Sequence, residues 1–340
     1  YKRQVRQFTN PLSQIAQAAT SLQSTAAASQ RVFEFLDQEE LSDESHKTER
    51  LPASQVQGDV VFSHVRFGYT PDKTIIQDFS AHAKPGQKIA IVGPTGAGKT
   101  TALKSMLSLV HPDGGSIEFF GLDFKEHERE IKKKIGFVSG GFSYYPHKKL
   151  KAITAATRAF YPDWREDAYN GYIKKFGLDE AKTPAQLSDG MKVKYALALA
   201  LSHGAQLLIL DEPTSGIDPV SREELVDIFL SLSDEGKTVF FSTHITSDLE
   251  KCADDVVYIR RGKILATGAL DGFISEYAAA EFSPAAFEAV PPELRAALIG
   301  VKRSKIGHSA LVSAEHAERA RSAGGEVRHA DLETIMVHLD

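Results

Sequence analysis

The sequence predicts an α/β fold built on a mostly parallel sheet. Short apolar runs typical of buried strands alternate with segments of helical character. A complete Gly-x-x-x-x-Gly-Lys-Thr pattern stands between one such run and the helix after it, and two carboxylates end another run. Strands that alternate with helices favour a parallel sheet with helices on its faces, so we expect this layout over residues 58–276.

The composition is that of an ordinary globular protein. The 340 residues are 42% hydrophobic and 25% charged, and the net charge of −5 gives no sign of general nucleic-acid binding. The single cysteine, Cys252, excludes a disulfide within the chain and fits a reducing compartment. No apolar run reaches the roughly 18 residues that a membrane span needs. Because the chain starts at Tyr1, without Met or a signal peptide, we expect it to be a piece of something longer.

Residues 1–57 are predicted to form a long amphipathic helix and a linker. Residues 37–57 are acidic and polar, which indicates the linker. The helix either packs on its own domain or enters from a preceding membrane domain, and the abrupt start of the chain favours the second. Pro11 marks a kink or a start point. Apolar or small residues recur at helical steps of three and four at Val5, Phe8, Leu12, Ile15, Ala19, Leu22, Ala26, Ser29, Phe33 and Leu36.

Strand and helix signals then follow one another along the chain. Alternating apolar residues from Val60 to Phe67 predict half-buried strands of an antiparallel β subdomain, and "KIAIVG" predicts a buried strand. Helices are expected after Lys99, Pro219 and Ile245, and an aromatic-rich helical subdomain over about residues 145–203. Further strands are predicted at "SIEFF", "KIGFV", "LLILD", "TVFFST" and "DVVYIR".

Two segments complete the predicted domain organisation. Residues 277–298 are rich in Ala and Pro and predict a second linker. Residues 299–340 predict a small α+β unit with the order strand, strand, helix, strand, helix. Its core candidates are Val301, Ile306, Leu311 and Val312. This unit fits regulation or a dimer contact better than catalysis.

The Gly-Lys-Thr pattern predicts a phosphate-binding loop. It follows a predicted strand and opens a helix, which is the context that the motif requires. Backbone N–H groups of such a loop and the helix N-terminus bind phosphate oxygens, Lys99 reaches the β- and γ-phosphates, and the Thr100 hydroxyl can ligate Mg²⁺. A glycine turn that merely joins strand to helix is the weaker alternative. The predicted nucleotide-binding residues are Gly93, Pro94, Thr95, Gly96, Ala97, Gly98, Lys99, Thr100 and Thr101.

Two carboxylates, Asp211 and Glu212, end the predicted strand "LLILD". In a parallel sheet that end lies beside the phosphate loop. Asp211 is therefore predicted to hold Mg²⁺, and Glu212 to orient and deprotonate an attacking water. Acidic residues also close strands for solubility alone, but their pairing with a phosphate loop favours the nucleotide role. His244 ends "VFFSTH" on a neighbouring strand and is a candidate contact of the γ-phosphate, although a lone histidine at a strand end is usually structural.

In their order along the chain these pieces resemble the ATP-binding cassette (ABC) ATPase family, over roughly residues 58–276. Tyr69 precedes the phosphate loop as the family's adenine-stacking residue does. The resemblance implies a P-loop nucleotide hydrolase in which the signature turn of one subunit caps the γ-phosphate held by a second. It assigns the family's Leu-Ser-Gly-Gly-Gln signature to Leu187, Ser188, Asp189, Gly190 and Met191, and the loop after the acidic pair, the D-loop, to Ser215, Gly216 and Asp218.

Several positions depart from the family's pattern. Gly140 stands where the family usually places a glutamine that helps to bind Mg²⁺ and carries movement to the membrane domain. Its absence predicts weaker metal coordination or altered coupling. Asp189 and Met191 replace a glycine and a glutamine of the signature. An added carboxylate close to a phosphate is repulsive unless it points away, or unless Lys192 and Lys194 offset it.

The resemblance is uneven along the chain. Residues 1 to about 103 resemble the end of a fused exporter, in which a transmembrane helix runs on into a linker and the cassette. The part after the phosphate loop is similar to a separate ATPase subunit of antibiotic or sodium exporters, which also carry a small C-terminal unit. The chain therefore resembles a hybrid of two subfamilies.

These observations predict an ATP-binding and ATP-hydrolysing domain of an ABC exporter. The expected cofactors are ATP and Mg²⁺. The expected partners are a second nucleotide-binding domain and a transmembrane domain, at the cytoplasmic face of the cell membrane; neither zinc nor nucleic acid is expected. The alternatives are a family member that acts outside transport and a catalytically weak ATP-binding module.

Overall fold

The computed structural model describes residues 15, 17–19, 21–23, 25–26, 28–30, 33, 37, 56, 58–70, 73–140, 145–305 and 307–339. They belong to two compact units, Tyr1–Arg50 and Leu51–Asp340. In the first unit the described residues from 15 to 33 are helical, and Ile15, Leu22 and Phe33 are exposed. Other members of the predicted apolar stripe lie outside the described residues, namely Val5, Phe8, Leu12 and Leu36. None of the helices in the described part of the chain is long and apolar enough to cross a membrane.

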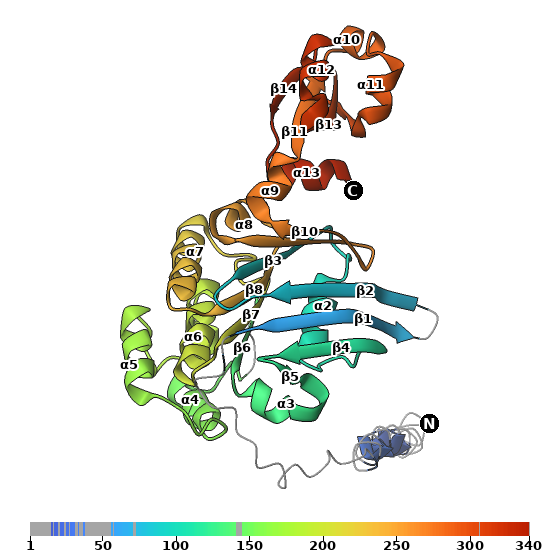
Figure 1. Ribbon diagram of the computed structural model, residues 1–340. Coiled ribbons are helices and arrows are strands. Elements are labelled where there is room, and N and C mark those ends of the chain that lie inside the picture. Colours follow the sequence, from blue (N-terminus) through green and yellow to red (C-terminus); the bar gives the residue numbers. More distant parts are fainter. Residues whose placement is uncertain are drawn as a thin grey trace, which may run out of the picture. The chain divides into compact units, whose positions relative to one another are not determined.

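The second unit is built on a ten-stranded sheet (Figure 1). Its neighbouring strands, in order, are β5 (Leu122–Asp123), β4 (Gly114–Phe119), β1 (Val60–Thr70), β2 (Lys73–Ala83), β10 (Lys263–Ala269), β9 (Asp255–Arg260), β3 (Lys88–Val92), β8 (Thr238–Ser242), β7 (Leu207–Asp211) and β6 (Ile135–Ser139). The five strands from β9 to β6 run parallel. The predicted α/β class with a parallel sheet is confirmed.

The parallel strands are buried on both faces, which explains their unbroken apolar runs. Successive side chains of a strand point to opposite faces. In β3, Ile89 and Ile91 therefore pack into one core cluster, and Ala90 and Val92 pack into another. Strand β7 divides in the same way, so each strand of the run serves two helical layers.

Strands β1, β2, β4 and β5 form the antiparallel part of the sheet. It joins the parallel part where Lys263 of β10 pairs with Asp78 of β2. Phe62 of β1 packs edge-on against Phe79 of β2, with ring centroids 5.3 Å apart, and against Phe240 of β8, at 5.9 Å. These aromatic contacts tie the antiparallel strands to the parallel core.

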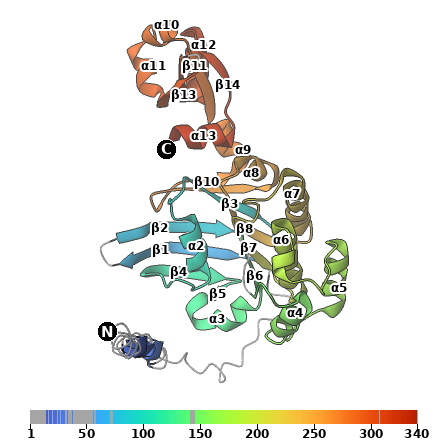
Figure 2. The ribbon, with the colours of Figure 1, turned by 180° about the vertical axis from the view of Figure 1, so that it is seen from behind.

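Helices occupy both faces of the sheet (Figures 1 and 2). Helix α2 contacts β2 and β7, and its Leu103 and Met106 are fully buried in the same core as Ile89 and Ile91. The helices of this layer and of the opposite one are α2 (Lys99–Met106), α3 (Phe124–Lys132), α4 (Leu150–Arg158), α5 (Glu166–Lys175), α6 (Asp189–Ser202), α7 (Pro219–Asp234), α8 (Thr246–Cys252) and α9 (Leu270–Ser275).

Helices α4, α5 and α6 group together at one side of the sheet (Figures 1 and 2). A buried hydrogen-bond chain holds them. The Thr154 hydroxyl of α4 lies 2.7 Å from the Tyr169 hydroxyl of α5 and 2.8 Å from the Tyr195 hydroxyl of α6. Tyr195 also donates to the Leu150 carbonyl oxygen. Because all three side chains are buried, the chain fixes the helices against one another.

The C-terminal part contains a second, four-stranded sheet with the order β12-β13-β11-β14. The structure differs from the prediction of a linker over residues 277–298, because these residues form β11, α10 and α11 of this unit. Strand β11 pairs with both β13 and β14, and its alanines and Phe282 are buried. Of the predicted core residues, Leu311 and Val312 are fully buried, whereas Val301 is 41% exposed and Ile306 lies outside the described residues. The elements are β11 (Tyr277–Phe282), α10 (Pro284–Glu288), α11 (Pro292–Ala297), β12 (Ile299–Ser304), β13 (Gly307–Ser313), α12 (Ala317–Ser322), β14 (Glu326–His329) and α13 (Leu332–Leu339).

Helix α13 contacts α8 of the sheet domain. The backbone N–H of Leu332, at the start of α13, donates to the Glu250 carboxylate of α8 at 2.5 Å. Leu332 and Ile335 share a buried core cluster with Leu249 and Cys252 of α8. The C-terminal unit is therefore attached to the helix that follows His244.

Candidate functional site

The predicted phosphate loop connects β3 to α2 at the carboxyl ends of the parallel strands. Gly93 leaves β3 at φ +150°, and a Cβ there would lie 2.0 Å from the Ile259 carbonyl oxygen of β9. Gly98 caps α2 at φ +107°. Both positions need glycine, because a side chain either meets neighbouring backbone or strains its own. The loop thus leads directly into the N-terminus of α2, where backbone N–H groups are free to bind an anion.

The Lys99 ammonium lies folded within this loop. Its Nζ donates to the Gly93 carbonyl oxygen at 2.6 Å and to the Pro94 carbonyl oxygen at 3.2 Å. Burial lowers the pKa of Lys99, and the Glu212 and Asp211 carboxylates oppose that effect. Lys99 is only 7% exposed but is flanked by acids, so a cation is held where a phosphate group is expected.

Asp211 joins the phosphate loop to the neighbouring strands. Its Oδ1 accepts a hydrogen bond from the Thr100 hydroxyl of α2 at 3.1 Å and one from the Ser242 hydroxyl of β8 at 2.7 Å. The structure therefore brings together the two predicted Mg²⁺ ligands, Thr100 and Asp211. A hydroxyl and a carboxylate are oxygen donors of the kind that Mg²⁺ prefers, and it binds through few protein ligands together with substrate phosphates. The donor set fits the ion.

The structure places Glu212, the predicted base, beside His244, the predicted γ-phosphate contact. Glu212 Oε2 lies 2.7 Å from His244 Nδ1, and both side chains are partly exposed. Glu212 has φ +51°, in the left-handed region that costs a non-glycine residue about 1–3 kcal/mol. Its backbone N–H is held by the Ser242 carbonyl oxygen at 2.9 Å. The backbone is thus fixed in a strained turn that presents a carboxylate at the end of the sheet.

Gly140 lies against this strained turn. Its N–H donates to the Asp211 carbonyl oxygen at 2.7 Å, and a Cβ at position 140 would come within 2.2 Å of the Glu212 carbonyl oxygen. A glutamine at this position needs the turn to move. The close packing of Gly140 on this turn has no signal in the sequence alone.

The signature residues Ser188 to Met191 form the start of α6, which lies beside α7. Ser188 caps α6, and its hydroxyl accepts a hydrogen bond from the Met191 N–H at 3.3 Å. The Asp189 carboxylate pairs with Lys192 at 2.7 Å, as one of the two expected offsets. Lys194 pairs instead with Glu224 of α7 at 2.5 Å.

Gly190 of the signature packs against the D-loop region. A Cβ there would lie 3.1 Å from the Ser221 Cβ of α7 and 3.6 Å from an Ile217 methyl group. Asp218 caps α7 by accepting from the Val220 and Ser221 N–H groups, and these hydrogen bonds lower its pKa. The Ser215 N–H donates to the Glu212 carbonyl oxygen at 3.2 Å. The D-loop therefore touches the acidic pair at one end and the signature helix at the other.

Tyr69 lies on β1, outside the contacts among the acidic pair, the D-loop and the signature helix. Its ring is 61% exposed and stacks edge-on against Phe67, with centroids 4.9 Å apart. One aromatic partner holds the ring and leaves much of its surface accessible. The adenine-stacking role remains a prediction.

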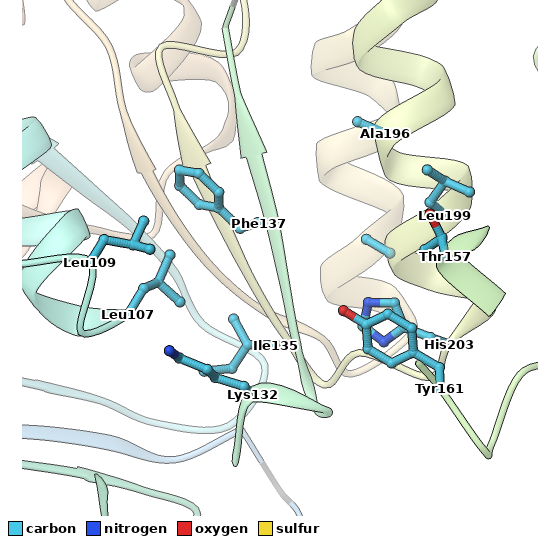
Figure 3. A pocket seen from close by; sticks show the side chains of 11 residues that line it. Leu107, Leu109, Lys132, Ile135, Phe137, Thr157, Tyr161, Ala196, Leu199 and His203 are labelled. Carbon is cyan, nitrogen blue, oxygen red and sulfur yellow. The ribbon is translucent and has the colours of Figure 1, made fainter. Parts of the chain in front are cut away.

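A cavity of about 300 Å³ lies between the sheet domain and the helical subdomain (Figure 3). Leu107, Leu109 and Phe137 line it on the sheet side. On the helical side, Tyr161 stacks on His203 with ring centroids 3.9 Å apart. The residues that line it are Leu107, Leu109, Lys132, Ile135, Phe137, Thr157, Tyr161, Ala196, Leu199, Ala200 and His203. Sequence reasoning did not find this cavity, because it draws on four separate segments, residues 107–109, 132–137, 157–161 and 196–203.

The phosphate loop, the acidic pair and the histidine at adjoining strand ends define a P-loop nucleotide-binding protein. The ABC transporter family model matches residues 76–215. The chain is 34% identical over 209 residues to "Nod factor export ATP-binding protein I" of Burkholderia pseudomallei (strain K96243). The aligned region covers 58% of this chain and 67% of the relative. The chain belongs to the ABC transporter family of ATP-binding subunits.

Two further comparisons extend this result. The chain is 33% identical over 278 residues to "Fatty acid ABC transporter ATP-binding/permease protein" of Mycobacterium tuberculosis (strain CDC 1551 / Oshkosh), which covers 78% of this chain and 42% of that protein. A solved "Structure of ATP binding subunit of ABC transporter" superposes with a TM-score of 0.58 at 25% identity, over 63% of this chain and 90% of that one. Its P-loop α/β fold is the one described above.

Proposed function

We propose that this chain hydrolyses ATP and couples hydrolysis to export through a membrane domain. The observation that carries the proposal is the Glu212 carboxylate. It lies 2.7 Å from His244, beside the Thr100–Asp211 pair and the Lys99 loop. The relatives named above are ATP-binding proteins of exporters and transporters.

Each side chain has a distinct task in this proposal. Lys99 leaves the Gly93 and Pro94 carbonyl oxygens and contacts the β- and γ-phosphates, while the loop N–H groups bind their oxygens. Thr100 and Asp211 would hold Mg²⁺, which neutralises charge on the phosphates when it is bound. Glu212 accepts the proton of the attacking water, and His244 fixes the orientation of that carboxylate.

The dimer is the second part of the proposal. The N-terminus of α6 carries Ser188 and Gly190, and it is a favourable place for an anion. Their contacts lie with α6 and α7 rather than with the phosphate loop of the same chain, among the residues that the structure describes. We propose that these residues complete the ATP site of a second nucleotide-binding domain.

The membrane partner is the third part. The cavity beside α6 exposes apolar side chains, and Leu109 and Phe137 are 56% and 36% exposed. Exposed apolar surface of this kind suits a partner segment. We propose that a transmembrane domain docks there, which places the chain at the cytoplasmic face of the membrane.

The alternative of a catalytically weak ATP-binding module has one observation in its favour. Gly140 removes the amide side chain that the family's pattern places near the metal. Steady-state ATPase activity of the purified chain separates the two functions. A chain that binds ATP with no turnover above background supports the binding module.

The Glu212→Gln variant tests the proposed chemistry. The amide keeps the shape but cannot accept the proton, so kcat falls by about 10²–10⁴-fold. ATP affinity stays close to that of the parent, because Lys99 and the loop are unchanged. Glu118→Gln, an exposed change on β4, is the matched control and retains parental turnover. Hydrolysis by Glu212→Gln at the parental rate shows that Glu212 is not the base.

A further inference from the structure

The Ser242 hydroxyl lies between the two acidic residues of the site. Ser242 is the last residue of β8 and is fully buried. Its Oγ donates to Asp211 Oδ1 at 2.7 Å and accepts from the Glu212 N–H at 3.2 Å. The register explains this position, because Ser242 pairs with Asp211 across the parallel β7 and β8 strands.

The direction of these hydrogen bonds is fixed by chemistry. An ionised carboxylate only accepts and a backbone N–H only donates, so the single hydroxyl proton of Ser242 must point to Asp211. The lone pairs of the same oxygen then face the Glu212 N–H. One hydroxyl therefore orients the side chain of Asp211 and the backbone of Glu212 together.

The Asp211 carboxylate and the Glu212 backbone both need hydrogen bonds that fix their orientation. Asp211 Oδ1 also accepts from Thr100, so Ser242 helps to set the angle at which the carboxylate meets the predicted metal ligand. Glu212 sits at φ +51°, a region that non-glycine residues rarely occupy unless their surroundings hold them there. Ser242 accepts hydrogen bonds from the Glu212 N–H at two atoms, its carbonyl oxygen and its Oγ.

We propose that Ser242 is a positioning residue that aligns the metal-binding carboxylate and the catalytic base as one unit. The inference rests on the proposed function, since it needs Asp211 at the metal and Glu212 as the base. Ser242 is fully buried, and its hydroxyl contacts Asp211 and the Glu212 N–H. It acts through the orientation of its two neighbours.

The test compares Ser242→Ala with Thr238→Val. Thr238 lies at the opposite end of the same strand, is fully buried, and uses its hydroxyl to accept the Gly86 N–H at 3.0 Å. Both changes delete one buried hydroxyl of β8, but only Ser242→Ala affects the acidic pair. Ser242→Thr keeps the hydroxyl and serves as the rescue variant.

The first readout is binding of a fluorescent ATP analogue to the full chain, in Mg²⁺ and in EDTA. Ser242→Ala is expected to bind the analogue in EDTA within about twofold of the parent, and to lose about tenfold of the affinity gained from Mg²⁺. The second readout is kcat at saturating Mg²⁺ and ATP, which falls by about tenfold or more because the base is misaligned. Ser242→Thr recovers both quantities, and Thr238→Val retains both.

The outcomes separate this inference from the function on which it rests. Equal behaviour of Ser242→Ala and Thr238→Val in both readouts overturns the inference while the proposed function stands, provided that the parent hydrolyses ATP and gains affinity from Mg²⁺. A parent with neither property overturns both. A loss of affinity by Ser242→Ala that is equally large in EDTA also overturns the inference, since it shows a general structural effect.

Discussion

His203 is a buried histidine that the site does not use. It is the C-cap residue that follows α6, is 4% exposed, and stacks on Tyr161 at the edge of the cavity (Figure 3). Burial lowers the pKa of His203 to about 4, and the nearby charges of Lys134 and Arg165 act in the same direction. The imidazole is therefore neutral near pH 7, and its protonation opposes the folded state.

The free energy of unfolding is expected to fall as pH falls through the window from about 6.5 to about 4. In that window the unfolded chain binds a proton at His203 and the folded chain does not. Between pH 7.5 and pH 5 this group removes about 2 kcal/mol of stability. His203→Phe keeps a ring for stacking and lacks this contribution. Urea unfolding at the two pH values measures the difference.

The control is His329→Gln, at an exposed position on β14. It should keep the full parental loss of stability at pH 5. If His203→Phe loses as much stability as the parent between the two pH values, the neutral buried imidazole is ruled out.

The site residues that the sequence predicted are those that a linear pattern marks. The phosphate loop and the acidic pair each stand in one short stretch, and strand ends are legible from apolar runs. Ser242 was not predicted, and neither was the packing of Gly140 against the Glu212 turn, since these features depend on strand register and on a backbone approach of 2.2 Å. Neither quantity has a signal in a single sequence.

At the scale of elements, alternation of strands and helices predicted the parallel sheet correctly. The prediction of a linker failed at residues 277–298, which form a strand and two helices. Alanine-rich "YAAAEF" followed by three prolines is typical of a linker, yet the small side chains are buried in a central strand. The partners of β11 are β13 and β14, which come later in the chain. Pairing between such distant segments decides the structure there, and local composition does not show it.

The contact between α8 and α13 gives a prediction at this scale. Glu250→Ala leaves the Leu332 N–H without its carboxylate, which costs about 1 kcal/mol at the start of α13. Amide hydrogen exchange in α13 should then be about fivefold faster, because exchange follows the local opening free energy.

Lys251→Ala is the matched control for this helix contact. Lys251 neighbours Glu250 on α8 but pairs with Glu223 of α7. Its loss should leave exchange in α13 unchanged. Equal exchange in Glu250→Ala and the parent means that the carboxylate does not hold α13.

At the scale of the whole molecule, the residues proposed for ATP fall into two groups. Lys99, Thr100 and Glu212 gather at the strand ends, whereas Ser188 and Gly190 begin α6. The D-loop connects the groups through backbone and packing contacts. The proposed dimer places the second group of one chain over the first group of its partner, so that two symmetric sites form together.

Complementation between two inactive chains tests this central claim most directly. One chain carries Glu212→Gln and the other carries Ser188→Arg. In a mixed dimer with shared sites, one site holds both lesions and the other holds none. Equal mixing should restore about a quarter of parental ATPase activity, because half of the dimers are mixed and each has one intact site. ATP-dependent cross-linking between the two variants confirms that mixed dimers form. If mixed dimers form and activity stays at the level of the single variants, Ser188 serves its own chain and the shared site is contradicted.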